Sequence, residues 1–436
     1  MKKREQILRQ RERHLYPTKI PYYREPLHLI KALDFYVWDE EGVRYLDAIG
    51  GIVSISAGHN HPRIKEKILK MLASDAIQHT SFLYLSEYMA DLAEKLSALA
   101  PGTLTKCYFT NSGSEANEMA VMTARMATGH EMVVSLRHAY HGGTGVPLGL
   151  CGHSTWKYPH QPQANVIHAQ APYCYRCPYG ASPQTCELEC AEDVRQVIET
   201  AGPGRIGAFI KEPIMGVGGF IDAGPDYHQK VFHIVKEYGG LYISDEVQTG
   251  AGRTGKHFFM SETLGIEPDI ITMAKGIGNG APLGAVVAKS EWAQTLAGKS
   301  HFNTFGGDPY QAMQARETIA IIEDEDLIAN ADHLGEYLLG GLKELQGDFP
   351  LIGDIRGRGL LIGLELVQDP KAKTPAPKET SELMERAKDE GVLIGKGGLY
   401  GNVIRLAPPL SITREGCDEL LTGLRNALMT LKGQSF

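Results

Sequence analysis

The sequence predicts an α/β protein with a mainly parallel sheet in a large domain and a smaller α+β domain. Short apolar runs alternate with amphipathic stretches through most of the 436 residues, up to about Ile322. Polar or aromatic residues follow directly where several of these runs end. Past Ile322 the alternation gives way to longer strands and helices of a different order. Alternating strands and helices favour a parallel sheet that is covered by helices on both faces.

The composition excludes several classes of protein. With 43% hydrophobic and 22% charged residues, the chain is typical of soluble globular proteins. A net charge of -8 gives no electrostatic case for binding nucleic acid or an anionic membrane. No apolar stretch approaches the roughly 18 residues that suggest a membrane span. The basic start lacks the apolar region of a secretory signal, and Glu5 and Glu12 disfavour a mitochondrial address, so we expect a cytoplasmic protein.

The N-terminal part contains signals for an exposed helix, a hairpin and a second helix. Residues 5–14 alternate in charge at helical spacing, which predicts an exposed helix. Residues 36–39 and 43–47 flank Glu-Glu-Gly, which is typical of a hairpin. A second helix is expected from about Arg63, because Pro62 suits the first helical position.

A serine- and glycine-rich turn predicts an anion site. The apolar run 106–110 is followed by Asn-Ser-Gly-Ser, and small residues then open a helix that runs to about Met126. Free N–H groups and the positive end of the helix dipole meet at such a turn. Simple N-capping by Ser112 or Ser114 explains the serines equally well. The position of the turn before a sheet of this kind favours a phosphate.

Several predicted strands end in residues that can do chemistry. Because the carboxyl ends of parallel strands meet at one rim, we expect these residues to lie close together. The runs and the residues that follow them are 132–135 with Tyr140 and His141, 206–210 with Glu212, 240–243 with Asp245, and 269–274 with Lys275. Each charge alone is more often a solvated surface group. A carboxylate and an amine at successive strand ends favour a single site.

The smaller domain is expected from three strands and two helices near the C-terminus. The strands are predicted at 360–366, 391–394 and 402–405, and helices at 381–389 and 415–431 would cover one face. No internal repeat interrupts this pattern.

Four of the seven cysteines cluster in the sequence, which leaves two interpretations open. A tight group of thiolates in a cytosolic protein suggests zinc, whereas the alternative is a loop of cysteines, reduced or oxidised, with no catalytic role. The spacing is not a clean pair of CxxC knuckles, and under either interpretation the segment is structural. The clustered residues are Cys174, Cys177, Cys186 and Cys190.

A long ordered motif resembles the signature of class III aminotransferases, which are pyridoxal-phosphate (PLP) enzymes of fold type I. It comprises residues 245–255 (DEVQTGAGRTG), 268–270 (PDI) and Lys275. The resemblance extends from about Tyr22 to Leu410 and is closest to the branch of alanine–glyoxylate aminotransferase 2, the pyruvate-linked omega-amino acid transaminases and the phosphoethanolamine phospho-lyases. It implies a large PLP-binding domain at 61–322 and a small domain built from 1–60 plus 323–436.

The resemblance implies roles for residues at the rim of the sheet. Lys275 supplies the amine that condenses with the cofactor aldehyde and then moves a proton. Asp245 pairs with the pyridine nitrogen and keeps it protonated, because a negative neighbour raises the pKa of a cation. The other residues implied in cofactor binding are Ser112, Gly113, Ser114, Tyr140, His141, Glu212, Val247 and Gln248. No metal is implied in the site.

The same resemblance assigns the substrate side of the site. Arg405 binds the substrate carboxylate, with Glu212 as its ion-pair partner when no carboxylate is present. A plain structural ion pair is the alternative for these two residues. Thr304 reaches the phosphate bound by a neighbouring subunit, which implies a homodimer or homotetramer. The residues implied to line the substrate pocket are Tyr22, Val53, Phe82 and Val217.

We therefore expect a transaminase that moves an amino group from an omega- or beta-amino acid, an amine or alanine to pyruvate or glyoxylate. One alternative keeps the cofactor but makes the protein a lyase that acts on a phosphorylated amino alcohol. A second alternative is a dinucleotide-binding α/β protein. It is disfavoured, because no Gly-x-Gly-x-x-Gly follows an early strand with a suitable acidic residue downstream. A non-catalytic scaffold gives Lys275 and Asp245 no reason to share a rim.

Overall fold

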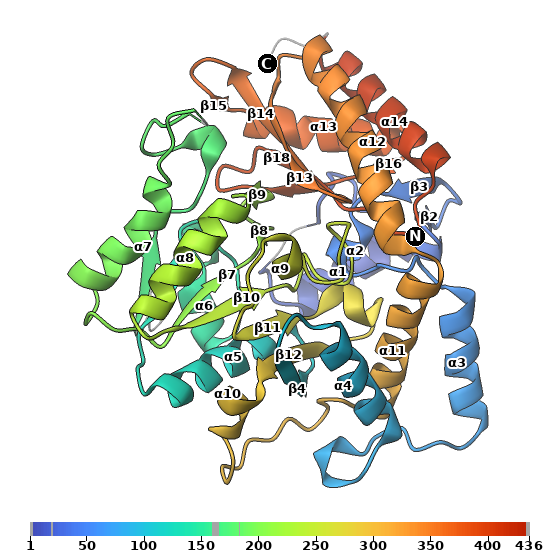
Figure 1. Ribbon diagram of the computed structural model, residues 1–436. Coiled ribbons are helices and arrows are strands. Elements are labelled where there is room, and N and C mark those ends of the chain that lie inside the picture. The colour runs from blue at the N-terminus through green and yellow to red at the C-terminus, as the bar shows by residue number, and fades with distance from the viewer. Residues whose placement is uncertain (1–2, 19–20, 159–164, 183, 433–436) are drawn as a thin grey trace.

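The computed structural model describes residues 3–18, 21–158, 165–182 and 184–432. Figure 1 shows a large part built around a central sheet and, above it, a smaller part made from the end of the chain. None of the helices in the described ranges combines the length and the apolar character that crossing a membrane requires.

The large part is organised around a seven-stranded sheet, counted over the described residues, with the strand order β4-β12-β11-β10-β7-β5-β6. Strands β10, β11, β7, β5 and β6 pair in parallel, whereas β12 runs antiparallel to β11 and β4. The predicted mainly parallel sheet is confirmed. Its strands are β4 Leu104–Thr110, β5 Val133–Leu136, β6 Val166–Ala169, β7 Ala208–Lys211, β10 Leu241–Asp245, β11 Ile270–Met273 and β12 Gly284–Lys289.

Helices cover both faces of this sheet because successive strand residues point to opposite sides. Ile210 and Ile243 pack in the core beneath α5, whereas their neighbours Phe209 and Tyr242 pack in the core beneath α8. All four side chains are fully buried, which explains the continuous apolar runs in the sequence. The helices of the large part are α3 Pro62–Ala73, α4 Glu87–Leu99, α5 Gly113–Thr128, α6 Gly145–Leu150, α7 Glu189–Thr200, α8 Pro225–Glu237, α9 Met260–Thr263, α10 Ser290–Gln294 and α11 Pro309–Asp324.

The smaller part contains an antiparallel sheet of β13, β14, β18 and β17, with β15 beside β14. Helix α12 packs on β13, and α13 packs against α14. Sequence patterning located β14, α13, β16, β18 and α14 but missed α12, β13 and the short strands β15 and β17. The glycines and charges of β13 hide its alternation. The bounds are α12 Leu327–Asp348, β13 Ile352–Arg358, β14 Leu361–Asp369, β15 Thr374–Pro375, α13 Pro377–Asp389, β16 Val392–Leu393, β17 Gly395–Gly397, β18 Val403–Leu406 and α14 Arg414–Lys432.

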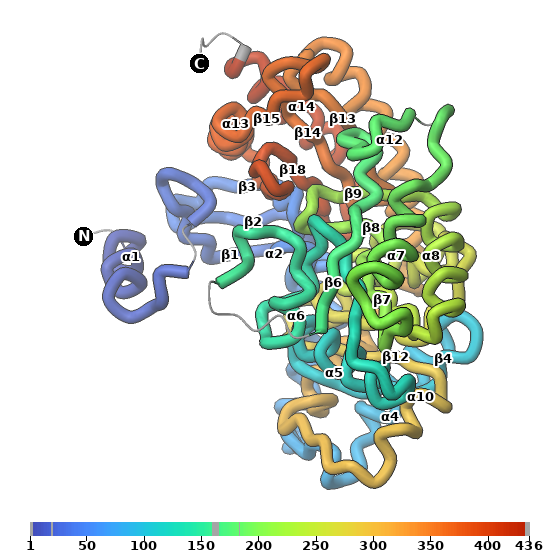
Figure 2. The backbone as a smooth tube through the Cα atoms, turned by 90° about the vertical axis from the view of Figure 1, so that its left-hand side faces the viewer, coloured from blue at the N-terminus to red at the C-terminus, as the bar shows by residue number. Residues whose placement is uncertain are grey.

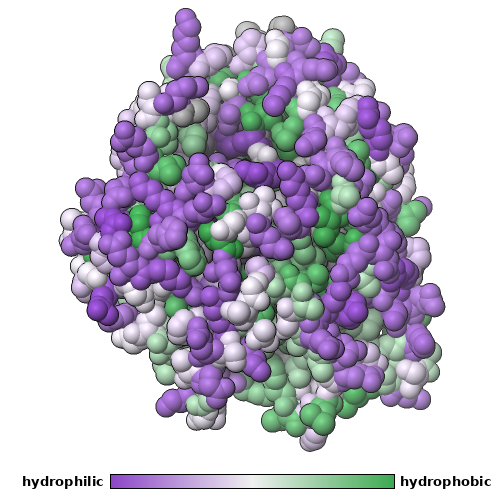
Figure 3. Space-filling model, in the orientation of Figure 1, coloured by the Kyte–Doolittle hydropathy of each residue, from purple (hydrophilic) through white to green (hydrophobic). Residues whose placement is uncertain are grey.

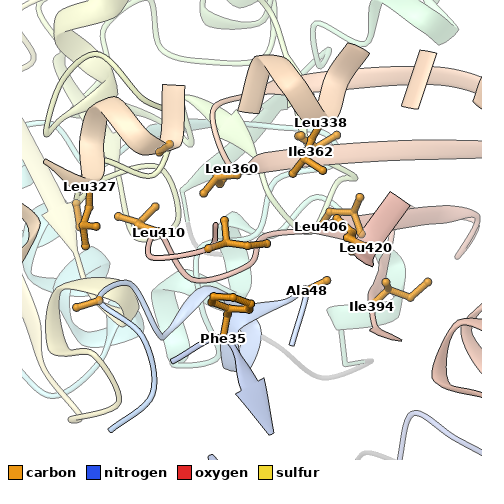
Figure 4. Packing of buried hydrophobic residues seen from close by; sticks show 14 of the residues in the cluster. Phe35, Ala48, Leu327, Leu338, Leu360, Ile362, Ile394, Leu406, Leu410 and Leu420 are labelled. Carbon is orange, nitrogen blue, oxygen red and sulfur yellow. The ribbon is translucent and has the colours of Figure 1, made fainter. Parts of the chain in front are cut away.

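The N-terminal segment packs with the C-terminal part. Strands β1 and β2 lead into β3, which pairs in parallel with β16 through Leu46 and Val392. Both Figure 1 and Figure 2 show this blue segment beside the orange and red elements. Figure 4 shows Phe35 and Ala48 in the same apolar core as Leu406. The domain boundaries themselves stay a prediction. The elements here are α1 Lys3–His14, β1 Leu29–Leu33, β2 Tyr36–Asp39, β3 Arg44–Asp47 and the short turn α2 Gly50–Val53.

A buried arginine ties three distant segments together. Arg253 donates from Nη2 to the carbonyl of Ile55 at 3.3 Å and from Nη1 to the carbonyls of Leu360, at 3.4 Å, and Pro408. Burial lowers the pKa of its guanidinium to about 9. None of these three carbonyls belongs to a helix or strand, so the guanidinium supplies donors that the backbone lacks.

Replacing Arg253 with Met is expected to destabilise the protein by about 2–4 kcal/mol, because buried carbonyls lose their donor. The change is measured as the shift of the urea unfolding curve. The control is Arg205→Met, since Arg205 is exposed, and its effect should stay within about 0.5 kcal/mol. Equal curves for the two variants would contradict the role given to Arg253.

Candidate active site

A cavity of about 370 Å³ lies at the rim of the central sheet where the expected strand ends meet. The turns after β4, β5, β7, β10 and β11 all contribute to its wall. It is lined by Ser54, Asn111, Ser112, Gly113, Ser114, Asn117, Tyr140, His141, Gly142, Glu212, Asp245, Val247, Gln248, Ala274, Lys275, Gly280, Ala281, Pro282 and Leu283. The structure therefore brings together all the rim residues that the sequence assigns to the cofactor, apart from Thr304.

Asp245 is a buried carboxylate held by side chains from two other elements. Its Oδ2 accepts hydrogen bonds from Nδ1 of His141 and from Nδ2 of Asn117, both at 2.7 Å. Its Oδ1 accepts from the backbone N–H of Val247 at 3.1 Å. Thr272 in turn donates to Asn117 at 2.6 Å, which fixes the orientation of that amide. A buried charge needs such partners, so the carboxylate is held in one place.

Sequence reasoning missed Asn117, although it lies only one helical turn beyond Gly113 in α5. The available signal was a polar amide on the face of the helix that also carries the anion turn. Asn117 is 1% exposed, and a buried amide in a helix otherwise rich in alanine and methionine needs partners. Its partners are the carbonyl of His141 and the carboxylate of Asp245.

Lys275 lies directly after β11 in a left-handed conformation, with φ of 51°. Its side chain reaches the same cavity as Asp245. Burial lowers the pKa of the Lys275 amine, Asp245 and Glu212 oppose that effect, and Arg405 adds to it. A lowered pKa increases the share of free amine near neutral pH, which a nucleophile and proton carrier requires.

The turn after Lys275 is tied to the N-terminal segment. Asn279 accepts at Oδ1 from the backbone N–H groups of Ser56, at 2.8 Å, and Ala57, at 3.0 Å, and its amide donates to the carbonyl of Gly58 at 3.0 Å. A Cβ on Gly276 would lie 2.3 Å from Oγ of Ser56, so the two backbones approach closely. The turn that follows Lys275 is therefore held in place by residues 56–58 of the N-terminal segment.

The start of α5 combines an N-cap with free donors. Oγ of Ser112 accepts from the N–H of Glu115 at 3.2 Å, which is an N-cap, and the Glu115 carboxylate accepts from the N–H of Asn111, one residue before the cap, at 2.9 Å. Oγ of Ser114 accepts from the N–H of Gly143 at 3.0 Å. Within the described residues, the N–H groups of Gly113 and Ser114 have no protein acceptor. Both interpretations of the serines therefore hold, because capping uses the side chains and leaves these two N–H groups for an anion.

The remaining walls suit a flat ring. A Cβ on Gly113 would lie 2.9 Å from both methyl groups of Val247, so the valine packs directly beneath the helix start. Tyr140 packs against Trp156, with ring centroids 4.8 Å apart. Nε2 of His141 and Oε1 of Gln248 are buried and have no partner among the described residues. An anion site, a carboxylate, an amine and unpaired polar atoms in one cavity fit PLP.

The expected ion pair between Glu212 and Arg405 is wrong for this structure. The two oxygens of Glu212 accept from the backbone N–H groups of Tyr140, at 3.0 Å, and Gly216, at 2.7 Å. No described carboxylate lies within ion-pair distance of Arg405, whose guanidinium lies over the ring of Phe220 at 5.6 Å. The carboxylate accepts from these two backbone groups because the N–H groups of Tyr140, after β5, and Gly216, after β8, need an acceptor.

Arg405 is buried but does not line the cavity. Burial lowers the pKa of its guanidinium, and Tyr22 and Glu212 oppose that effect. Its Nε has no partner in the part of the chain that the structure describes. One donor of this arginine is therefore still available for an acceptor.

The other residues assigned to the substrate also lie outside the cavity in this single chain. Tyr22 lines a separate cavity of about 350 Å³ beside α1, and Val53 is buried in α2. Phe82 stacks on Tyr108 with centroids 5.4 Å apart, and Val217 lies in the turn after β8. Thr304 is exposed. Ser54 and Ala281 line the cavity instead, and nothing in their local sequence singled them out.

All seven cysteines are free thiols. Within the described ranges, no group of three or more ligating side chains is arranged to hold a metal ion. Cys174, Cys177, Cys186 and Cys190 lie close enough to influence one another, and burial first and then the other three thiols raise the pKa of Cys190 to about 12. The geometry gives the zinc interpretation no support.

The fold and the cavity together define a PLP-dependent transferase of fold type I. The model of the family "Aminotransferase class-III" matches residues 21–428, and the chain belongs to this family. It is 43% identical over 418 residues to alanine–glyoxylate aminotransferase 2 homolog 2, mitochondrial, from Arabidopsis thaliana, covering 96% of this chain and 86% of that protein. It is 36% identical over 442 residues to human alanine–glyoxylate aminotransferase 2, mitochondrial, with 97% and 86% covered.

A solved structure agrees with these relatives. An (S)-enantioselective omega-transaminase from Thermomicrobium roseum superposes with a TM-score of 0.90 at 32% identity, over 99% of each chain. The expected fold, enzyme class and cofactor are confirmed: the protein is a PLP-dependent aminotransferase. These relatives give no support to the phospho-lyase alternative.

Replacing Asp245 with Asn is expected to lower kcat/KM by about 10²–10⁴-fold, because losing one member of a buried charge pair costs about 3–5 kcal/mol. The rate is measured with a saturating cofactor concentration. The control Glu262→Gln removes an exposed carboxylate and should leave kcat/KM within about twofold. An Asn variant as active as the control would show that the charge has no role.

Proposed function

We propose that the protein transfers an amino group from an omega- or beta-amino acid, an amine or alanine to pyruvate or glyoxylate. The observation that carries this proposal is the cavity in which the Lys275 amine and the Asp245 carboxylate meet the free N–H groups of α5. When bound there, PLP supplies a ring that accepts the electron pair left on the substrate carbon. The names of the relatives, alanine–glyoxylate aminotransferase 2 and omega-transaminase, support the donor and acceptor classes.

The residues of the cavity divide the work between binding and proton transfer. The free N–H groups of Gly113 and Ser114 would hold the phosphate of the cofactor. The Asp245 carboxylate would favour the protonated form of the pyridine nitrogen, because its negative charge stabilises a cation. With the cofactor bound, Nζ of Lys275 would take a proton from the substrate carbon and deliver the same proton to the cofactor carbon, and the lowered pKa of the amine favours both steps.

The carboxylate of the keto acid is assigned to Arg405. Its guanidinium is buried on the small-domain side, next to the loop that follows Glu212, and it retains an unpaired Nε. A guanidinium binds a carboxylate through two parallel hydrogen bonds, which a lysine cannot match. A substrate that has a carboxylate therefore depends on Arg405 more than a primary amine that has none.

Replacing Arg405 with Ala is expected to raise the KM for pyruvate about 10–100-fold, because a charge-assisted pair is worth about 1.5–3 kcal/mol. The KM for a primary amine without a carboxylate should change less than about threefold. Arg205→Ala removes an exposed guanidinium and is the matched control. Equal changes for pyruvate and for the amine would remove Arg405 from carboxylate binding.

The reaction itself is tested by crossing a panel of amino donors with pyruvate and glyoxylate. Consumption of one keto acid per amino group transferred is the expected stoichiometry. Release of ammonia and phosphate from a phosphorylated amino alcohol, with no keto acid required, would contradict the proposal and favour the lyase.

We further propose that the active unit is at least a homodimer, with a homotetramer as the larger form. Exposed apolar side chains gather on the segment before α4 and on the segment between α10 and α11. They are Leu83 at 73%, Tyr84 at 70%, Leu85, Phe302 and Phe305. Figure 3 shows hydrophobic surface at the lower end of the molecule, where Figure 1 places these segments. Thr304 is exposed within this surface, and we assign it to the anion site of a second copy.

A double replacement of Leu83 and Leu85 with Asp is expected to convert the assembly into a monomer of 47.7 kDa with little activity. Charges buried in an apolar interface cost several kcal/mol. The mass is measured by light scattering in solution. The control Met429→Asp changes an exposed side chain on α14 and should leave the mass unaltered. A wild-type protein that is active as a monomer would contradict the proposal.

The location in the cytoplasm is likewise proposed. Seven unpaired thiols are compatible with a reducing compartment, because disulfides form where the surroundings are oxidising.

A further inference from the structure

A charged side chain outside the cavity lies fully buried at the end of the strand that precedes Glu212. Lys211 is the last residue of β7 and is 1% exposed. Alternation along the strand places it on the same face as Phe209, where Tyr227 and His228 of α8 are its neighbours. Fully buried lysines are almost always paired with a carboxylate, and among the described side chains Lys211 has no ion-pair partner.

The Lys211 ammonium uses all three of its donors on neutral acceptors. Nζ donates to the carbonyl oxygens of Glu212, at 2.7 Å, and Pro213, at 3.0 Å, and to Nε2 of His228, at 3.3 Å. Nδ1 of His228 donates in turn to the hydroxyl of Tyr242 at 3.0 Å. Burial lowers the pKa of the Lys211 amine to about 8 and the pKa of His228 well below its usual value. At neutral pH the lysine is thus mostly charged and the imidazole is free to accept.

These carbonyls need the lysine because the sheet ends before them. The ladder between β7 and β10 stops at the pair of Lys211 and Ser244. The carbonyls of Glu212 and Pro213 therefore lie beyond the last rung, in a buried turn. A buried carbonyl without a donor is costly, so the ammonium defines where this turn lies.

The turn connects Lys211 to two charged groups, Glu212 in the cavity wall and Arg405 outside it. Glu212 points into the cavity, and its carboxylate accepts from the N–H of Gly216, which closes the turn. The next carbonyl, of Val217, accepts from the N–H of Gly398 at 2.9 Å. A Cβ on Gly397 would lie 2.9 Å from Cδ of Arg405, so this backbone packs against the arginine stem.

We propose that Lys211 is a positioning residue for the carboxylate side of the active site. Its ammonium holds the turn that places Glu212 in the cavity and supports the backbone against which Arg405 packs. The side chain touches no substrate and acts through this turn. The inference rests on the role proposed above for Arg405 and adds a specificity determinant to it. A purely structural lysine would lower stability and affect all substrates alike.

The test uses Lys211→Met in the full-length, cofactor-loaded protein, because methionine fills similar space and donates no hydrogen bond. The KM for pyruvate is expected to rise about tenfold, which corresponds to part of a charge-assisted hydrogen bond. The KM for a primary amine without a carboxylate should stay within about twofold. Lys378→Met removes an exposed lysine of α13 and is the matched control. If Lys211→Met leaves the ratio of the two KM values within about twofold of wild type, whatever its stability, the proposal is overturned.

A second measurement separates this inference from the function on which it rests. Pyruvate binding is followed by the rise of Tm with pyruvate concentration, which needs no turnover. The pyruvate concentration that produces a set rise of Tm is expected to increase about tenfold in Lys211→Met, and an unchanged concentration overturns the proposal even if no transamination is found. A wild-type protein that binds pyruvate but transfers no amino group would count against the proposed function alone.

If Lys211→Met does not fold, His228→Leu takes its place in both measurements, because it removes the third acceptor of the Lys211 ammonium, together with one hydrogen bond to Tyr242. The expected rise for pyruvate is then about threefold. The proposal would likewise be overturned if His228→Leu had the wild-type KM for pyruvate and needed the wild-type pyruvate concentration for the same rise of Tm.

Discussion

A single buried carboxylate determines the arrangement of the active site. Asp245 lies at the end of a central strand, away from water, and such a charge is tolerated only where donors surround it. His141, Asn117 and the N–H of Val247 supply those donors from three different elements. The turn after β5, the first turns of α5 and the turn after β10 are therefore held at fixed positions around one oxygen pair.

Helix α5 serves the site twice because of this arrangement. Its first two N–H groups have no acceptor among the described residues and are left for an anion, and one turn later its Asn117 fixes the carboxylate. The distance between anion and carboxylate is thus set by the geometry of one helix. Lys275 completes the cavity from the end of the next strand. Burial lowers the pKa of its amine, and the negative charges of Asp245 and Glu212 oppose that effect. A rigid negative group and a reactive amine in one cavity are what PLP chemistry demands of a protein.

The sequence located the reacting groups because they follow strands with clear apolar runs. Asp245, Lys275, Glu212 and the Gly113 turn all lie where the periodicity breaks, and the parallel sheet brings those breaks together. Asn117 escaped notice because its partner Asp245 is 128 positions away, and no local pattern reports such a contact. The pairing of Glu212 failed for a related reason. Its carboxylate found backbone donors within its own turn and on the turn of Tyr140, which no residue identity could reveal.

The substrate side depends on elements that sequence pattern cannot place relative to one another. Tyr22, Phe82 and Thr304 were chosen by resemblance, and in the single chain they lie on surfaces outside the cavity. Their segments carry exposed apolar side chains, which suit contact with a second copy. The sequence pattern also did not predict the burial of Lys211, because a lysine at a strand end is ordinarily a solvated charge.

The account depends most directly on a covalent link between Lys275 and the cofactor. Purified protein incubated with PLP, reduced with borohydride and digested should carry the pyridoxyl mass on the peptide that contains Lys275. Attachment at a different lysine, such as Lys211, or an unmodified Lys275 peptide in protein that has bound PLP, would contradict it.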